Sequence, residues 1–355
     1  MRVTLFRPFP DQYRFSMAKY ADELHRRVGQ YMKAGESIEL QAFPAPRLEG
    51  LGRYWDQYRR YGRYAAAHAG DVNHVVDHGF GHLASQLPAG RTIVTFHDAV
   101  VTRIPGVRWT TKASLNHSLR AMRKAAAIVC DSQDGKRDLL ELAQIPEDKI
   151  RVIPIGIDES FRPAADRAIV RRKLGLSGNV VLMVGHTQGY MNCARMLRAV
   201  ATVIARHGVD LTLVKVGLPF TPDQMRLIVD LELGDRIEIV GRVPAAEMPS
   251  YYQAADVLLY APLLAGFGLP PLEAMACGTP VVASNRGSIP EVSGDAAVLT
   301  DAENEGEIAV ALADVLTNQA RRRRLIDAGF ARAGLFEWSV SARAFLELYR
   351  GVARA

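Results

Sequence analysis

The chain has 355 residues, 48% of them hydrophobic, with a formal charge of +6 at pH 7 and a pI of about 9.3. This length predicts two domains, each with a core of its own. The basic charge is dispersed, so it fits an acidic substrate or an anionic membrane surface as well as nucleic acid. Three distant cysteines, Cys130, Cys193 and Cys277, exclude a disulfide framework and a zinc site, and indicate buried thiols in a reducing compartment.

The sequence holds no apolar run of the roughly 18 residues that a spanning helix needs. Its first residues carry no signal core, because Arg2, Arg7, Asp11 and Arg14 interrupt them. We therefore expect a cytoplasmic protein, free in solution or lying on the inner face of the membrane.

In the first half of the chain, short apolar runs alternate with stretches of helical periodicity. The expected strands are 3–6, 38–42, 73–76, 92–96, 126–130 and 150–153. The expected helices are one capped by Ser16, with apolar residues at a 3.6 period, and the stretches 112–127 and 133–143. This alternation predicts a parallel sheet covered on both faces.

Residues 54–64 interleave aromatic residues with arginines. They fit a helix with half-buried tyrosines and solvated arginines, but also contact with a membrane interface or a phosphate-bearing lipid, or stacking on nucleic acid.

His74, His78 and His82 are spaced for a metal on a helix, although Gly79 and Gly81 favour a hydrogen-bonding loop. His97 follows strand 92–96, at the end where open parallel sheets bind ligands; a purely structural histidine is the alternative.

Residues 158–170 read as a linker, and a second series of strands follows it. The expected strands are 180–184, 211–216, 237–240, 257–260, 281–283 and 297–299. Helical periodicity separates them, and the arginine run 321–324 reads as a solvated helix face. Ser339 is expected to cap a last helix, which packs back on the first domain.

Two glycine turns follow strands of this second series. Gly266 and Gly268 lead into Pro270, Pro271 and a helix, and Gly185 opens a similar turn. Glycine lets backbone N–H groups approach a ligand, and a helix N-terminus attracts anions, so both turns predict a diphosphate site. We expect Glu273 on the first turn of its helix, where it can accept hydrogen bonds from a ribose diol.

The stretch from Gly266 to Val282 resembles the signature of glycosyltransferase family four, a retaining group with the GT-B fold. Phe96-His97-Asp98, Cys130-Asp131-Ser132 and the closing Trp338-Ser339 are similar too and stand in the family's order. The resemblance implies an α/β fold of two Rossmann-like domains with parallel sheets facing across a cleft. The expected divisions are an acceptor-side domain 1–160, a nucleotide-sugar-binding domain 161–335 and a returning helix 336–355.

The resemblance also implies the site. His97 lies near the reacting carbon, Glu273 holds the ribose, and Arg242 and Val243 lie against the base. The other implied donor-binding residues are Gly185, His186, Asn192, Gly266, Phe267, Gly268 and Leu269. No metal or other cofactor is expected, because helix dipoles and basic side chains carry the charge of the leaving diphosphate. The implied partners are a nucleoside-diphosphate sugar and a glycan or lipid-linked acceptor, with an anionic membrane surface and without nucleic acid.

Two positions depart from the family. Ala265 stands where a glutamate contacts the donor sugar, and Met191 stands where a lysine faces the diphosphate. His186 or Arg195 are candidate substitutes for that lysine. The sequence thus predicts a retaining transferase that moves a hexose such as mannose or glucose, for polysaccharide or glycolipid assembly. The alternative is a nucleotide-sugar-binding protein with impaired or no turnover; a 2-epimerase of the same fold matches the signature less well.

Overall fold

A computed structural model describes residues 1–8, 15–43, 52, 55–104 and 106–355. The chain divides into two compact units. Unit 1 combines Met1–Gly156 with Trp338–Ala355, and unit 2 is Ile157–Glu337. The sequence placed these divisions after residues 160 and 335, a few residues away.

Unit 1 is built on a six-stranded parallel sheet in the order β2-β1-β3-β4-β5-β6. Its strands are β1 (Arg2–Arg7), β2 (Ser37–Ala42), β3 (Val72–Val75), β4 (Thr92–Phe96), β5 (Ala127–Cys130) and β6 (Ile150–Val152). All six expected strands are confirmed within two residues. Every residue of β3, β4 and β5 is buried, as the continuous apolar runs of a doubly covered parallel sheet require.

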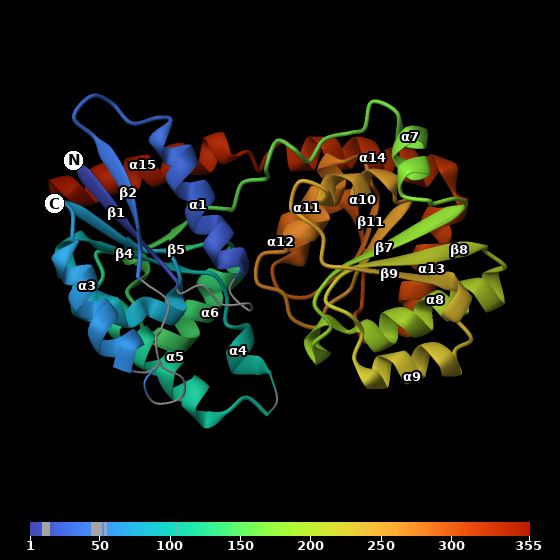
Figure 1. The fold of residues 1–355 in the computed structure, drawn as a ribbon, viewed down its shortest axis with the longest axis horizontal. Helices are drawn as coiled ribbons and strands as arrows, with labels where there is room; N and C mark the ends of the chain where they lie inside the picture. The colour runs from blue at the N-terminus through green and yellow to red at the C-terminus, as the bar shows by residue number, and fades with distance from the viewer. Residues whose placement is uncertain (9–14, 44–51, 53–54, 105) are drawn as a thin grey trace. The chain divides into compact units, whose positions relative to one another are not determined.

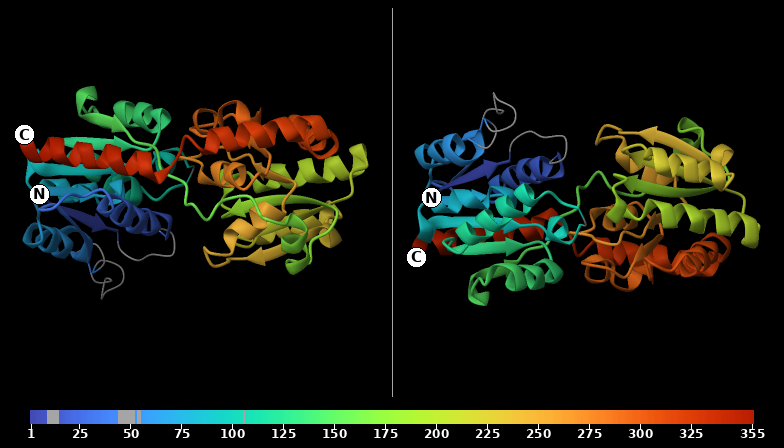
Figure 2. Two further views of the ribbon diagram at one scale, coloured as in Figure 1. Left: turned by 90° about the horizontal axis from the view of Figure 1, so that it is seen from above. Right: turned by 90° about the horizontal axis from the view of Figure 1, so that it is seen from below.

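The helices of unit 1 cover both faces of this sheet. They are α1 (Phe15–Gly29), α3 (Tyr61–Ala67), α4 (Val100–Arg103), α5 (Trp109–Met122), α6 (Gln133–Ala143) and α15 (Trp338–Arg354), with the π-helix η1 (Asp56–Arg60) and the 3₁₀ helix η2 (His78–Ser85). Helices α1 and α15 pack together on one face, and α5 packs against η2 on the other (Figures 1 and 2).

Three expected helix boundaries in unit 1 are wrong. Helices α1 and α15 begin two residues earlier than expected, so Ser16 and Ser339 lie in the first turn and are not the residues that precede it. Helix α5 ends at Met122 and not at 127, because the following residues turn into the buried, β-branched strand β5.

Unit 2 is built on a second six-stranded parallel sheet, in the order β12-β11-β10-β7-β8-β9. Its strands are β7 (Asn179–Gly185), β8 (Leu211–Gly217), β9 (Ile237–Gly241), β10 (Val257–Tyr260), β11 (Val281–Ser284) and β12 (Ala297–Thr300). All six expected strands are confirmed. Strand β7 lies between β10 and β8, so the loops that follow these three strands emerge side by side at the carboxyl edge of the sheet.

The helices of unit 2 form two layers. They are α7 (Arg167–Lys173), α8 (Cys193–His207), α9 (Pro222–Asp230), α10 (Met248–Ala254), α11 (Leu269–Ala276), α12 (Ile289–Ser293), α13 (Glu305–Thr317) and α14 (Gln319–Ala333). Helix α8 packs against α9 and α13, whereas α11 packs against α10 and α14 on the other face (Figure 1).

The arginine run at the start of α14 is only partly solvated, unlike the expectation. Arg323 and Arg324 are exposed. Arg321 pairs with Asp314 at 3.0 Å, and Arg322 donates to the carbonyls of Val315 and Leu316. Since these acceptors lie at the end of α13, the two arginines join that helix to α14, Arg322 through its last carbonyls and Arg321 through the Asp314 carboxylate.

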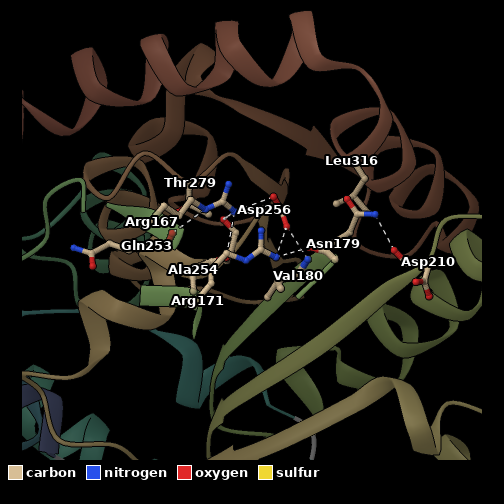
Figure 3. Close-up of polar contacts among 12 residues, drawn as sticks. Arg167, Arg171, Asn179, Val180, Asp210, Gln253, Ala254, Asp256, Thr279 and Leu316 are labelled. Atoms are coloured by element: carbon tan, nitrogen blue, oxygen red, sulfur yellow. Dashed lines mark hydrogen bonds and ion pairs between the residues drawn. The ribbon is translucent and has the colours of Figure 1, made fainter. Parts of the chain in front are cut away.

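The amino-terminal edge of the second sheet is fixed by one buried carboxylate (Figure 3). Asp256 precedes β10 and accepts a hydrogen bond from the backbone N–H of Val180 in β7, at 2.8 Å. Arg167 and Arg171 of α7 pair with the same carboxylate at 2.8 and 3.3 Å. The buried negative charge is therefore satisfied from both sides, and it ties α7, β7 and β10 together at the edge opposite the loops.

Candidate donor site at the carboxyl edge of the second sheet

Strands β7 and β8 both end in a glycine, and the backbones are in close contact there. Gly185 and Gly217 are paired in register and have φ values of +112° and +115°. A Cβ at Gly217 would lie 2.3 Å from the carbonyl oxygen of Gly185, so no larger residue fits there. The backbone N–H of Leu218 donates to the same oxygen at 3.1 Å. The predicted glycine turn thus rests directly on the end of β8.

The loop from β7 to α8 carries four of the predicted residues. Met191 is buried at the end of a short 3₁₀ turn, Gly189–Met191. Asn192 follows in the left-handed conformation, and its Nδ2 donates to the carbonyls of Ala261 and Ala302, at 2.9 and 2.7 Å. Its Oδ1 accepts from Arg195. The buried amide of Asn192 is therefore occupied in anchoring the loop.

His186 lies on the same loop, in the position that follows Gly185. Its Nε2 is 2.8 Å from the hydroxyl of Tyr190. Its Nδ1 is buried without a hydrogen-bond partner among the described residues. Burial and the nearby Lys215 lower the pKa of this imidazole, so the ring is neutral at pH 7. Arg195, the other candidate substitute for a lysine, is held by Asn192.

The loop from β10 to α11 contacts the loop from β7 to α8. The backbone N–H of Leu263 donates to the carbonyl of Tyr190 at 2.8 Å. Gly268 has φ +92°, and a Cβ there would lie 2.5 Å from the Cδ1 atom of Ile289. Phe267 is buried, and its carbonyl accepts from Ser288 at 2.8 Å. The loops 186–192 and 261–268, which follow β7 and β10, are therefore in contact at the carboxyl edge, and we call them the rim.

Ala265 and Gly266 precede this turn, and Leu269 is the first residue of α11. A Cβ at Gly287 would come within 2.7 Å of the carbonyl oxygen of Ala265, so that segment also packs tightly under the rim. Pro270 and Pro271 occupy the first turn of α11, where a missing N–H costs no hydrogen bond.

Glu273 is the fifth residue of α11, so it lies on the second turn and not on the first as expected. Its Oε2 accepts a hydrogen bond from the hydroxyl of Tyr252 at 2.7 Å. Tyr252 is buried, and burial together with this carboxylate raises the pKa of its phenol far above the usual range. The phenol therefore stays a donor and fixes one oxygen of Glu273, a partner that sequence reasoning missed.

Arg242 and Val243 follow β9 at the far side of the same edge. Arg242 is exposed and Val243 is half-buried, after a Gly241 with φ +81°. Strand β8 separates β9 from β7, so these two residues lie further along the edge than the contacting loops.

In unit 1, three strand ends converge on His97. Its Nδ1 is 2.5 Å from Asp131 Oδ2, after β5, and its Nε2 is 2.8 Å from the carbonyl of Val76, after β3. Both ring nitrogens meet acceptors, so both carry a proton. Burial alone would lower the pKa of His97, but the Asp131 carboxylate outweighs it and raises the pKa to about 9. The ring is only 3% exposed.

The three histidines spaced for a metal, His74, His78 and His82, are held by hydrogen bonds within the unit. His74 lies on β3, between the hydroxyls of Tyr349 and Thr95, each at 2.7 Å. Burial lowers its pKa to about 3, so it is neutral. His78 and His82 lie in the 3₁₀ helix η2 and not in a loop. No group of three metal-ligating side chains occurs in the part of the chain that the structure describes.

The aromatic and arginine stretch is helical over 55–67; Tyr54 lies outside the described residues. Tyr61 is buried and donates to the carbonyl of Arg7 at 2.5 Å, whereas Arg59 and Arg63 are exposed. Two tryptophans stand out into solvent in this unit: Trp55 is 59% exposed and Trp109 is 79% exposed. Over the described residues, no helix is long and apolar enough to cross a membrane.

All three cysteines are free and buried, as expected.

Two family models match the chain: glycosyl transferases group 1 over residues 166–332, and Glycosyltransferase Family 4 over residues 12–161. The chain is 33% identical over 240 residues to a D-inositol 3-phosphate glycosyltransferase of Acidothermus cellulolyticus, covering 64% of this chain and 53% of that protein. It is 29% identical over 272 residues to the O-antigen chain mannosyltransferase B of Escherichia coli, covering 73% and 70%. The chain spans about half the length of the first curated relatives it matches.

Among solved structures, the fold is similar to that of Anabaena Alr3699/HepE in complex with UDP and glucose. The TM-score is 0.80 at 16% sequence identity, with 99% of this chain and 100% of that chain covered. At this identity the likeness concerns the fold.

The glycine contact at the rim is directly testable. Gly217→Ala forces a Cβ against the Gly185 carbonyl at a positive φ, so we expect the free energy of unfolding of unit 2 to fall by about 2 kcal/mol or more. Urea unfolding measures this. Gly234→Ala is the control, because nothing lies within 4 Å of its Cβ position. Equal midpoints for the two variants would contradict the contact.

The His97–Asp131 pair predicts a pH dependence of stability. The pKa of His97 is raised, so its contribution is complete below its unfolded value of about 6.5 and is lost as pH rises through about 9. We expect Asp131→Asn to destabilise the protein at pH 6, and its deficit relative to the wild type to shrink by pH 10. Urea midpoints across this range measure the deficit. A deficit that does not change with pH would show that His97 is neutral.

Proposed function

The chain belongs to glycosyltransferase family four and has the GT-B fold, and from this premise we propose that it transfers a hexose from a nucleoside-diphosphate sugar to a glycan or lipid-linked acceptor. One observation carries the proposal: the two glycine turns of unit 2 touch through Leu263 and Tyr190 and form a single rim. Backbone amides at such a rim, beside the N-termini of α8 and α11, suit a diphosphate. The Anabaena protein of this fold is described in complex with UDP and glucose.

In this proposal each part of the rim has one task. The amides from Phe267 to Leu269 bind the diphosphate or sugar hydroxyls, and Arg242 and Val243 contact the base. Glu273 accepts from the ribose hydroxyls, and the hydrogen bond that Tyr252 donates to its Oε2 keeps the carboxylate oriented. The buried Asn192 supports the loop and not the ligand.

We further propose that transfer retains the anomeric configuration and needs no metal. An oxygen of the donor's own diphosphate takes the acceptor proton on the face from which it departs, through an oxocarbenium-like transition state. The protein orients the two substrates and stabilises the departing charge. His97, bonded at both ring nitrogens, acts through the loop after β4 as a positively charged positioning residue. Unchanged transfer in the presence of a metal chelator would support this scheme.

A second candidate, a binding protein with impaired turnover, is favoured by two observations. Met191 is buried and carries no charge, and Ala265 has no carboxylate to offer the donor sugar. Each loss removes a preorganised charge, which costs on the order of 100-fold or more in rate.

Restoring both groups separates the candidates. If turnover is impaired, Ala265→Glu with Met191→Lys should raise the transfer rate roughly 100-fold or more. Radiolabelled or coupled assays of transfer and donor hydrolysis measure it. Val310→Lys, at an exposed position of α13, adds a lysine elsewhere as the control. Equal rates for the wild type and the double variant would discard the impaired candidate, and no turnover by either would discard the transferase.

A lipid-linked acceptor is supported by the surface of unit 1. Tyr58 of η1 and Ser114 of α5 share a hydrogen bond of 2.5 Å, so Trp55 and Trp109 project from neighbouring elements. Residues 99–130 contain no aspartate or glutamate. Exposed tryptophans near basic residues suit the headgroup region of an anionic membrane.

We expect the wild type to float with liposomes that contain phosphatidylglycerol, and less so at high salt, because screening weakens the attraction of basic residues. Trp55→Ala with Trp109→Ala should reduce the bound fraction several-fold. Val229→Ala, which removes a 72% exposed side chain from unit 2, should leave it unchanged. If the wild type does not float with these liposomes and is fully active on a water-soluble acceptor, the proposed membrane contact is wrong.

A further inference from the structure

A buried lysine lies beneath the rim. Lys215 is the fifth residue of β8, and it is 1% exposed. Its Nζ donates to the carbonyl of Gly185 at 2.6 Å and to the carbonyl of Val216 at 3.0 Å. The ring centroid of Phe220 is 6.0 Å away. The register between β8 and β9 shifts between Lys215 and Val216, and such irregularities redirect side chains at the edges of sheets.

This ammonium group has no counter-charge in the described part of unit 2. No carboxylate forms an ion pair with it, and the titratable groups that face it are His186, from the loop after β7, and Cys193, from α8. Burial lowers the pKa of the imidazole and raises the pKa of the thiol to about 11, so both are neutral at pH 7. A buried charge without a partner is costly, and proteins keep such charges where a ligand offsets them.

The charge of Lys215 lies close to Met191, the position at which the family carries a lysine. Lys215 Nζ contacts the carbonyl of Gly185, and the methyl group of Met191 lies 3.6 Å from the Cβ position of the same glycine. The unpartnered Nδ1 of His186 belongs to the next residue. The neighbouring α8 begins at Cys193, and no side chain caps its N-terminus. All of these features favour an anion at one place.

We propose that Lys215, acting from beneath the β7–α8 loop, supplies the positive charge for the donor's diphosphate that the family's lysine supplies from position 191. This inference rests on the proposed function and deepens it. Lys215 is a positioning residue: it holds the Gly185 carbonyl and contributes its field, while the amides of the loop and Nδ1 of His186 face the phosphate oxygens.

The first test measures binding by calorimetry, with whichever of UDP, GDP and ADP the wild type binds most tightly, and with the corresponding uncharged nucleoside. We expect Lys215→Met to weaken the diphosphate at least 10-fold and to leave the nucleoside unchanged. Lys149→Met is the matched control, because Lys149 also donates to two carbonyls, those of Arg123 and Ala125, in unit 1. Equal loss of both ligands would show that Lys215 only supports the fold, which would overturn the inference.

The second test measures proton uptake by Lys215 when the diphosphate binds, which a purely structural role of this lysine would not produce. Burial lowers the pKa of Lys215 to about 8, and an arriving anion raises it again. Between pH 8 and 9 the wild type should therefore take up a proton on binding the diphosphate, and its affinity should fall as pH rises. Calorimetry in two buffers of different ionisation enthalpy measures the uptake; the phosphates themselves are already fully ionised. An affinity that stays level from pH 7.5 to 9.5 would overturn the inference, even if the variant fails to fold.

A third test moves the lysine from position 215 to position 191. Met191→Lys in the Lys215→Met background moves the charge to the family's position, and we expect it to recover most of the lost diphosphate affinity. Failure to recover would indicate that the charge is not what Lys215 contributes. A wild type that binds none of the three nucleoside diphosphates would instead discard the proposed function itself, whereas a wild type that binds while Lys215→Met binds equally well would discard only this inference.

Discussion

The close approach of Gly185 and Gly217 is the constraint on which the candidate site depends. Because Gly217 has no Cβ, the ends of β7 and β8 come near enough for the Gly185 carbonyl to accept from Leu218 and from Lys215. A side chain at Gly217 would push the strand ends apart. The loop after β7 would then lose its support, and with it the contact to the loop after β10. One steric condition thus decides whether the rim exists.

Buried charge is handled differently across the molecule. Asp256 is surrounded by arginines, and His97 is matched with Asp131, so each of these charges is neutralised inside its own unit. Lys215 is buried as deeply but meets only carbonyl dipoles and the face of Phe220. Dipoles stabilise a cation without neutralising it. The uncompensated charge lies under the predicted diphosphate site and not at the opposite edge of the sheet, which favours a ligand as its partner.

The strands could be predicted from the sequence because buried parallel strands are continuous apolar runs, and all twelve were found. The contacts of single side chains could not. Asp131 is 34 residues from His97 and meets it only because β4 and β5 are neighbours in the sheet. Glu273 moved to the second turn because α11 starts at Leu269, ahead of the two prolines. Lys215 left a signal, a charged residue inside an apolar strand, whose meaning depends on the register shift that the structure adds.

The two departures from the family, Ala265 and Met191, can be compared by the charge that each removes. Exchanging a glutamate for Ala265 and a lysine for Met191 removes one negative and one positive charge, so the net charge of the rim is unchanged by the two together. In the site that we propose, Lys215 supplies the positive charge, while Ala265 has no carboxylate to offer the sugar. In this proposal the diphosphate keeps a cation, whereas the hexose loses a hydrogen-bond acceptor. A site with these proposed contacts would keep its affinity for the diphosphate and relax its selection of the sugar, because an ammonium group recognises charge and not the arrangement of sugar hydroxyls.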